Sequence, residues 1–579
     1  MMNLLWCERT LFIIFLSNIP ALAQRESDGP TVQVPQGLIK GTYEKSYRNR
    51  TYSAFEGIPF AKPPIGNLRF QAPVPADAWN GILKANKKYE CLQFIPFSLF
   101  FGPRGTEDCL YIYVYVPREI INSNELLDVV VHIHGGAFML GSPKFMAGPE
   151  FLMDKDIVYV SFNYRLNSLG FLSTGDDVIP GNNGLKDQVL AMEWIKDNIK
   201  FFGGNPTSIT LTGLSAGAAS VHYHYLSPLS KGLFHRGLSQ SGTALQHWSL
   251  KLNPLDDAKI LAKNLSCPTS SSQKILDCLR ECDGNALMNA TISFYKHVDG
   301  IPFNIFGPVI EPRSENAFIS EHPYKIMENG NIYDVPWITS NTKDEGLFPV
   351  GFILWLKKLR LLDEQWYDIM PYIIETNNKL DKNTEHDVLS KIKTFYFKDK
   401  PLTEENIHSL IDLFTERLFL TDAEEAIKMH TAAVRSEVYY YSFSYILKMP
   451  SFPPSKVKGT SHGDDTRLLL GMIGTPSKLQ DHDEQMMELF TEFLAEYAQK
   501  GIPKFKDVEW LPQDRHVDKL NILYINNVND IEMRTVDKLG FSDFWNSLPL
   551  LQVERTVSYS TVLKCSFVLN VLSLLILFL

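Results

Sequence analysis

Short apolar runs bounded by turn residues recur through the first half of the chain, and each one predicts a buried strand. They occupy residues 110–116, 129–133, 157–162 and 209–211. Between the last two runs, residues 183–195 carry apolar side chains at helical spacing without a proline, which predicts a helix. Alternation of this kind is typical of an α/β fold with a large, mostly parallel central sheet and helices on both faces.

The second half of the chain has a mostly helical pattern from Pro254 onward. Apolar periodicity predicts helices over residues 404–419 and 484–499, and a strand-like run returns at residues 438–444. Neither an internal repeat nor a long linker divides the sequence. We therefore expect one large domain over residues 24–550, with the helical segments as insertions.

Composition narrows the class of partner. The chain has 579 residues, of which 45% are hydrophobic, so it can bury a large core. Its formal net charge of −10 is opposite to the basic footprint of a nucleic-acid-binding protein. The short basic cluster at residues 357–360 is interpreted as a solvated face.

The N-terminus has the pattern of a cleaved secretory signal. An apolar stretch at residues 11–19 follows a charged pair and precedes Ala21-Leu22-Ala23, so residues 1–23 are predicted to be a signal peptide. Export would place the chain in the secretory pathway and then outside the cell, where disulfides persist. Three sequons agree with export and predict glycosylation at Asn49, Asn264 and Asn289.

The C-terminal segment also bears on location. Residues 565–579 are almost wholly apolar, and nothing polar follows them. A stretch this short suits the removable signal of a glycosylphosphatidylinositol (GPI) anchor better than a lasting membrane helix. Residues 551–579 are therefore predicted to be a spacer and hydrophobic tail that leads to membrane attachment through a lipid anchor. A tail-anchored form and a simply secreted form are the alternatives.

The chain contains seven cysteines, of which Cys7 lies in the predicted signal and Cys565 in the tail. Two loops are each flanked by a pair of cysteines, namely Cys91 with Cys109 and Cys267 with Cys278. If both loops are closed, Cys282 is the odd thiol. The spacing alone leaves a pairing of Cys267 with Cys282 open.

The most informative motif is Gly213-Leu214-Ser215-Ala216-Gly217, which follows an apolar run and opens a segment of small residues. A serine between two glycines can occupy a turn too tight for larger neighbours, and the turn lifts its hydroxyl clear of the sheet. The motif is the sequence form of a nucleophile elbow. It predicts Ser215 as a nucleophile.

A serine hydroxyl needs a base, an acid that orients the base, and donors for the oxyanion. Gly135 and Gly136 follow a predicted strand, and their N–H groups, with that of Ala216, would form a three-donor oxyanion hole. The acid candidate is Glu345, in the turn at residues 340–346.

The second candidate acid is the neighbouring Asp344. The base candidate is His462, in the turn at residues 459–465. With Glu345 as the acid, the chain order is nucleophile, acid, base, as expected for a sheet whose nucleophile comes first.

These motifs stand in the order found in the type-B carboxylesterase and cholinesterase family, and the chain resembles the insect carboxylesterases of that family. The resemblance covers nearly the whole mature chain. It rests on the elbow and on residues 107–111, 134–138, 163–166, 169–171, 183–188 and 202–206.

The resemblance implies an α/β-hydrolase fold and a serine carboxylesterase that acts on a small-molecule ester through an acyl-enzyme, without a cofactor or metal. It implies a catalytic triad of Ser215, Glu345 and His462. The oxyanion hole it implies is formed by Gly135, Gly136 and Ala216. The family's structural ion pairs match Arg69 with Glu107 and Arg165 with Asp187, and its disulfides match Cys91–Cys109 and Cys267–Cys278, which leaves Cys282 extra.

A metal site at His222 and His224 is not expected. Residues two apart on a helix point to opposite sides, and no third ligand lies near them in the sequence.

Departures from the family pattern bear on the substrate. Many relatives have glutamate before the nucleophile, whereas this chain has Leu214, and residues 92–108 lack the tryptophan with which cholinesterases bind a quaternary ammonium. Neutral, apolar esters are therefore the expected substrates. Juvenile hormone esterase-like specificity is an alternative, although those enzymes usually have glutamine at this position. A neuroligin-like adhesion protein without activity is the alternative from another class.

Overall fold

A computed structural model of the chain describes residues 29–95, 102–121, 125–295, 302, 304–377, 379–451 and 453–550. The predicted signal peptide and the predicted C-terminal tail lie outside the described residues. In the part that is described, no helix is both long enough and apolar enough to span a bilayer.

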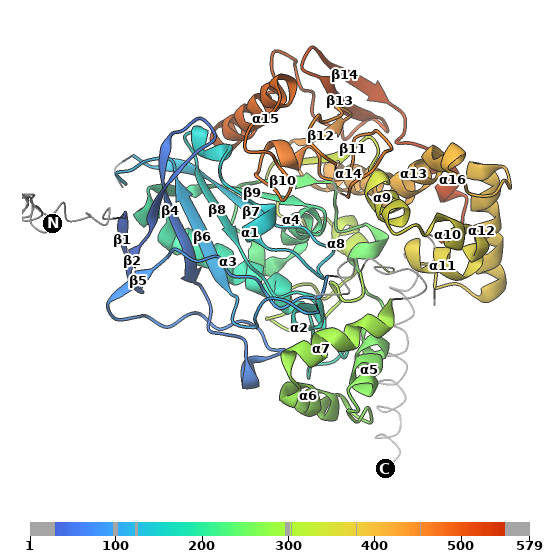
Figure 1. Cartoon of the computed structure of the whole chain (residues 1–579), viewed down its shortest axis with the longest axis horizontal. Coiled ribbons are helices and arrows are strands. Elements are labelled where there is room, and N and C mark those ends of the chain that lie inside the picture. The colour runs from blue at the N-terminus through green and yellow to red at the C-terminus, as the bar shows by residue number, and fades with distance from the viewer. Residues whose placement is uncertain are drawn as a thin grey trace, which may run out of the picture.

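A mixed sheet of 11 strands forms the centre of the molecule (Figure 1). Its strands are β3 (Thr42–Lys45), β4 (Thr51–Pro59), β6 (Tyr111–Val116), β7 (Leu127–Ile133), β8 (Val158–Phe162), β9 (Gly204–Leu214), β10 (Arg236–Gln240), β11 (Trp337–Thr342), β12 (Val438–Phe443), β13 (Leu520–Asn527) and β14 (Asp530–Val536). Their spatial order is β14-β13-β12-β11-β10-β9-β7-β8-β6-β4-β3. The strands from β13 to β8 in this order pair in parallel, and the two edges are antiparallel. A separate small sheet contains β1 (Thr31–Val34), β2 (Gly37–Lys40) and β5 (Ile82–Lys84).

Helices connect the strands and form the insertions predicted for the second half. In chain order they are α1 (Pro143–Met146), α2 (Asn167–Phe171), α3 (Asn183–Asn198), α4 (Ala216–Leu226), α5 (Pro254–Asn264), α6 (Ser272–Glu281), α7 (Gly284–Ala290), α8 (Pro323–Glu328), α9 (Leu347–Trp355), α10 (Leu359–Glu364), α11 (Trp366–Ile373), α12 (Lys382–Phe397), α13 (Ile407–Thr415), α14 (Thr421–Ala433), α15 (Asp481–Lys500) and α16 (Ser542–Asn546). In Figure 1, α5–α7 gather at one side of the sheet and α10–α13 with α16 at another.

Two hydrophobic cores lie on opposite faces of the sheet because successive side chains of a strand alternate in direction. In β7, Val129 and Val131 belong to one core, which also includes Val221 of α4. Val130 points the other way and packs in the core that contains Phe490 of α15. Helices therefore cover both faces, and the α/β-hydrolase prediction is confirmed.

The predicted elements of the first half correspond to β6, β7, β8, β9 and α3. The predicted helix over residues 404–419 differs in detail, because α13 ends at Thr415 and continues as a π-helical turn over Glu416–Leu420 before α14. A π turn widens the helix locally by one residue, and a pattern of apolar spacing cannot detect that change.

Candidate active site

Ser215 lies on the tight turn between β9 and α4, as the elbow motif predicts. Its backbone has φ 59° and ψ −122°, which L-residues rarely adopt. A Cβ atom on Gly213 would lie 2.4 Å from the backbone of Gly217, and one on Gly217 would lie 2.0 Å from the Ile133 oxygen. Both flanking positions therefore require glycine. The turn is held by the Ser215 N–H, which donates to the Gln240 carbonyl at 2.8 Å.

His462 and Glu345 are 117 positions apart in the chain, and the fold brings them into contact. The His462 Nδ1 atom lies 2.6 Å from Glu345 Oε2, and the Glu345 side chain is fully buried. The other carboxylate oxygen accepts hydrogen bonds from the Thr342 N–H at 2.7 Å and the Ser241 hydroxyl at 2.5 Å. A carboxylate held this way fixes the proton of the imidazole on Nδ1, so Nε2 is left as a proton acceptor.

Asp344, the second candidate acid, has a different position. One of its carboxylate oxygens accepts a hydrogen bond from the Thr460 N–H at 2.9 Å, and its own N–H donates to the Thr460 carbonyl at 3.1 Å. These bonds link the loop of the acid to the loop of the base. Asp344 therefore shapes the turn before His462, while Glu345 is the carboxylate that contacts the imidazole.

Gly135 and Gly136 approach the elbow so closely that side chains are excluded. A Cβ atom on Gly135 would lie 2.7 Å from the Leu214 oxygen and 3.1 Å from the Cβ of Ser215. Gly136 has φ +116°, and a Cβ there would lie 1.9 Å from the Leu140 oxygen. Ala216 is the first residue of α4. The three predicted oxyanion donors thus belong to two backbone segments that meet at Ser215.

Aromatic rings surround the base. Phe419 and Phe348 lie with their ring centroids 4.7 Å and 5.4 Å from that of His462. Phe419 also contacts Trp248, which in turn contacts Phe138 beside the predicted oxyanion segment. Apolar rings therefore flank the base.

The π-helical turn explains how Phe419 reaches the base. The Leu418 carbonyl within this turn accepts a hydrogen bond from Trp248 Nε1 at 2.8 Å, and Asp422 just after it accepts from the His247 N–H at 3.0 Å. These bonds hold Trp248 and Phe419 together. Sequence reasoning missed both residues, because neither belongs to a motif and the contact depends on the π turn.

Ser241 and Asp465 are two further residues that sequence reasoning missed. Ser241 has φ +56° directly after β10, which aims its hydroxyl at Glu345. Asp465 is fully buried, accepts a hydrogen bond from the Tyr441 hydroxyl at 2.7 Å, and has a pKa raised by burial and by the nearby Glu345. The only sequence signal for Ser241 is its place as a small residue after a strand. The only signal for Asp465 is its place as an acid shortly after His462.

The predicted framework contacts are present around the site. Arg69 and Glu107 form a bidentate ion pair at 2.5 and 2.7 Å, and so do Arg165 and Asp187 at 2.6 and 2.8 Å. The two disulfides implied by the family are formed, with Cα atoms 4.9 Å apart for Cys91–Cys109 and 5.8 Å for Cys267–Cys278. Cys282 is the free cysteine among the described residues.

The two helix histidines have separate partners. His224 lies 2.7 Å from the Ser230 hydroxyl and 2.9 Å from the Gln188 side chain. His222 Nε2 lies 3.2 Å from Nδ1 of His430, a neighbour from α14 that the sequence spacing did not predict. Burial lowers the pKa of His430 to about 3 and that of His222 well below its usual value, so both rings are neutral.

The stability of the fold is expected to fall in acid because of such neutral, buried histidines. Burial lowers the pKa of His224 to about 3, whereas in the unfolded chain it is about 6.5. The unfolded state alone therefore takes up the proton as the pH falls through 6.5, which costs about 1.4 kcal/mol per pH unit until the folded pKa is reached.

Urea unfolding at pH 7 and pH 5 tests this effect with His224→Gln as the variant. The variant should lose about 2 kcal/mol less stability than the wild type between these pH values. Equal losses in the two proteins would contradict a neutral His224.

The described fold, with a serine on the turn between a parallel strand and a helix, defines the chain as an α/β-hydrolase. A sequence model of the carboxylesterase family matches residues 28–545. Venom carboxylesterase-6 of Apis mellifera is 38% identical over 93% of this chain and 98% of its own length. Esterase FE4 of Myzus persicae is 36% identical over 90% and 93%. The crystal structure of juvenile hormone esterase from Manduca sexta, with OTFP covalently attached, has a TM-score of 0.78 and 26% identity, covering 90% of this chain and 99% of that one.

The chain belongs to the carboxylesterase family, and it is a carboxylic ester hydrolase. The resemblance noted from its motifs is confirmed. The enzyme interpretation is therefore kept, and the adhesion interpretation is dropped.

Proposed function

We propose that this carboxylesterase works through a Ser215–His462–Glu345 triad and an acyl-enzyme. The observation that carries the proposal is the 2.6 Å contact between His462 Nδ1 and the buried Glu345 carboxylate, in a fold that also holds Ser215 on a strained elbow. A base whose Nδ1 proton is fixed by a carboxylate can accept a proton at Nε2. No cofactor or metal takes part in this proposal.

In the first half-reaction, the Ser215 hydroxyl attacks the ester carbonyl while its proton passes to His462. The alcohol then leaves with that proton, and the acyl group stays on Ser215. In the second half-reaction, water gives a proton to His462 as it attacks the acyl-enzyme. The carboxylic acid then leaves, and His462 returns that proton to the Ser215 oxygen. Glu345 stabilises the imidazolium in both halves.

The backbone N–H groups of Gly135, Gly136 and Ala216 are the donors that we assign to the oxyanion. The close approach of the glycine segment to Ser215 supports this role, because donors help only when they are held where the negative charge develops. Without side chains on the glycines, an ester carbonyl can reach these groups.

A fluorophosphonate probe tests the nucleophile directly, because it reacts covalently with an activated serine. The wild-type protein should be labelled and Ser215→Ala should not. Ser220→Ala is the matched control, since Ser220 lies in α4, the helix that follows the elbow, and donates to the Ala216 carbonyl at 2.8 Å. Folded wild-type protein that resists the probe would contradict the mechanism.

Neutral esters with apolar groups are the proposed substrate class. Phe419, Phe348 and Trp248 provide apolar surroundings for the base, and Leu214 stands where a carboxylate would attract a cationic substrate. Leu214 is 4% exposed and packs against the loop of the base. Its closeness to that loop is shown by Gly463, where an added Cβ would lie 3.1 Å from the Leu214 Cδ2. Juvenile hormone esterase-like specificity is the second candidate, supported by the similarity to the Manduca sexta enzyme.

Leu214→Glu is expected to raise the preference for a cationic ester over a neutral one on the order of tenfold, because a nearby carboxylate attracts the cation. The measurement is kcat/KM for acetylthiocholine and for a neutral thioester of the same acyl group. Leu214→Gln is the matched control, with nearly the same shape and no charge. An equal change of preference in both variants would show that shape, not charge, controls selection.

We place the enzyme outside the cell, secreted or held at the cell surface by a GPI anchor. The support is the sequence pattern of residues 1–23 and 551–579, together with the exposed positions of Asn49, Asn264 and Asn289, which we propose as glycosylation sites. A phosphatidylinositol-specific phospholipase should release the protein from the surface of expressing cells. A chain truncated after residue 550 should be secreted without treatment. Full-length protein that stays on the cells after treatment would contradict the anchor.

A further inference from the structure

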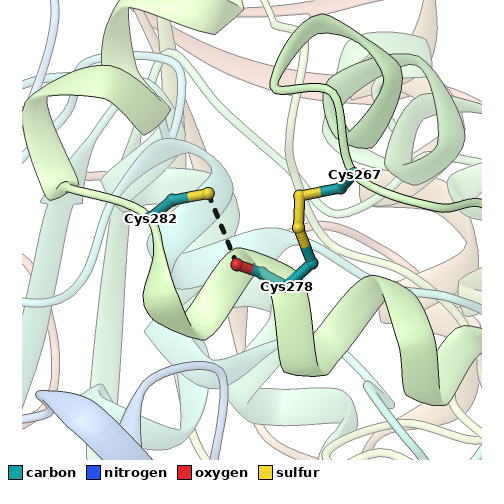
Figure 2. A group of neighbouring side chains, drawn as sticks. All are labelled: Cys267, Cys278 and Cys282. Atoms are coloured by element: carbon teal, nitrogen blue, oxygen red, sulfur yellow. Dashed lines mark hydrogen bonds between the residues drawn. A yellow bond between two sulfur atoms is a disulfide. The ribbon is translucent and has the colours of Figure 1, made fainter.

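Three cysteine side chains meet at the end of α6, away from the proposed triad (Figure 2). Cys267 and Cys278 form a disulfide, and all three sulfur atoms, that of Cys282 included, lie within 4.8 Å of one another. The Cys282 thiol donates to the Cys278 carbonyl at 3.4 Å, as the dashed line in Figure 2 shows. Since two of the sulfurs share a covalent bond, the cluster presents a thiol to a disulfide and lacks the three free thiolates that a metal would need.

The geometry of the helix end presents two cysteines to the same partner. Cys278 lies in the last turn of α6, and Cys282 is the residue that ends the helix, four positions later. Residues four apart lie on the same side of a helix, so both side chains are near Cys267, which follows α5. Cys267 is therefore close enough to form a disulfide with either Cys278 or Cys282. The sequence spacing left the same two pairings open.

We propose that Cys267 exchanges its partner between Cys278 and Cys282, so that this region holds two interconverting disulfide isomers. The Cys282 thiolate attacks the Cys267 sulfur, and the new Cys267–Cys282 bond forms as the Cys267–Cys278 bond breaks. The electron pair of the broken bond leaves on the Cys278 sulfur, which takes up the proton that Cys282 lost. No external oxidant or reductant is consumed.

Contacts of the Cys282 backbone make Cys267–Cys278 the major isomer. The Arg69 guanidinium donates to the Cys282 carbonyl at 2.6 Å and to the carbonyls of Leu279 and Arg280 at 3.0 and 2.9 Å, and it pairs with Glu107. Drawing Cys282 toward Cys267 strains these bonds. Exchange thus moves the disulfide of Cys267 from Cys278, within α6, to Cys282, at the junction between α6 and α7. This movement works against the Arg69–Glu107 ion pair, which holds the junction in place.

The rate of exchange rises with pH, because the thiolate is the attacking species. Burial raises the pKa of the Cys282 thiol, and the positive charge of Arg69 opposes this rise. Exchange is therefore slow near neutrality and accelerates toward alkaline pH.

Tryptic peptide mapping reads the pairing directly, because cleavage after Lys263, Lys274, Arg280 and Lys296 leaves each cysteine on its own peptide. These peptides span residues 264–274, 275–280 and 281–296. The purified full-length protein is incubated at pH 6 or pH 9, quenched with acid, alkylated while unfolded, deglycosylated and digested without reduction. At pH 6 we expect residues 264–274 linked to 275–280. At pH 9 a second product should appear, with residues 264–274 linked to 281–296 and Cys278 alkylated.

Two variants extend the test. Cys278→Ser should carry a complete Cys267–Cys282 disulfide without free thiols at these positions and should keep esterase activity, whereas Cys282→Ser should give one linkage at both pH values. Two alkylated cysteines in active Cys278→Ser, together with a single linkage in the wild type at pH 9, would overturn the proposal. A bond between Cys278 and Cys282 in the wild type would overturn it as well, because Cys267 would then be free.

Discussion

Replacing His462 by glutamine is expected to lower kcat on the order of 10⁵-fold while leaving the fold intact. Glutamine fills most of the same space and can still hydrogen-bond to Glu345, but it cannot accept the serine proton. The remaining rate should come from the oxyanion donors and from binding alone. Steady-state hydrolysis of a neutral ester, followed together with the thermal unfolding temperature, measures both consequences.

His482→Gln is the matched control for this experiment, because His482 is an exposed residue of α15. Its activity should equal that of the wild type. A His462→Gln enzyme that unfolds at the wild-type temperature and keeps more than about one hundredth of the activity would exclude His462 as the base, since general-base removal costs far more.

Replacing Glu345 by glutamine is expected to lower kcat on the order of 10⁴-fold. The carboxylate accepts hydrogen bonds from His462 Nδ1, the Ser241 hydroxyl and the Thr342 N–H. An amide in its place presents an N–H to the imidazole, which moves the ring proton to Nε2 and prevents it from accepting a proton from Ser215. The loss should appear in kcat more than in KM.

Asp344→Asn is the matched control, because it removes the same charge one residue away. Asp344 accepts a hydrogen bond from the Thr460 N–H, and the asparagine oxygen can keep that bond, so we expect a loss below about tenfold. If Asp344→Asn were the more damaging of the two substitutions, the assignment of Glu345 as the orienting acid would be wrong.

The choice between Asp344 and Glu345 shows where local sequence information ends. Both acids lie in the same turn, and either side chain is long enough to approach a histidine. The choice depends on the hydrogen bonds that hold Glu345 between Ser241 and Thr342, and on the loop that brings Thr460 to Asp344. Thr342 is a local partner, but Ser241 and Thr460 come from segments more than 100 positions away, so spacing could not reveal them.

The aromatic residues beside the base were equally hidden. Phe419 lies within a predicted helix, where an apolar residue is normally a core residue. The π turn over Glu416–Leu420 directs it toward His462, and the bond from Trp248 to Leu418 completes that arrangement. His430 beside His222 and Cys282 beside the Cys267–Cys278 disulfide are further examples of contacts formed by packing.

The sequence by itself determined the features that depend on local backbone constraints and on residue chemistry. The glycines around Ser215 specify the elbow because any side chain there would collide with the backbone. The apolar runs specify the strands. Leu214 stands where many relatives have a glutamate, so the negative charge is missing whatever residues surround it. Only the tertiary structure decided how Glu345 is held against His462, which rings surround the base and how near Cys282 lies to the Cys267–Cys278 disulfide, because these depend on long-range packing that brings distant segments together.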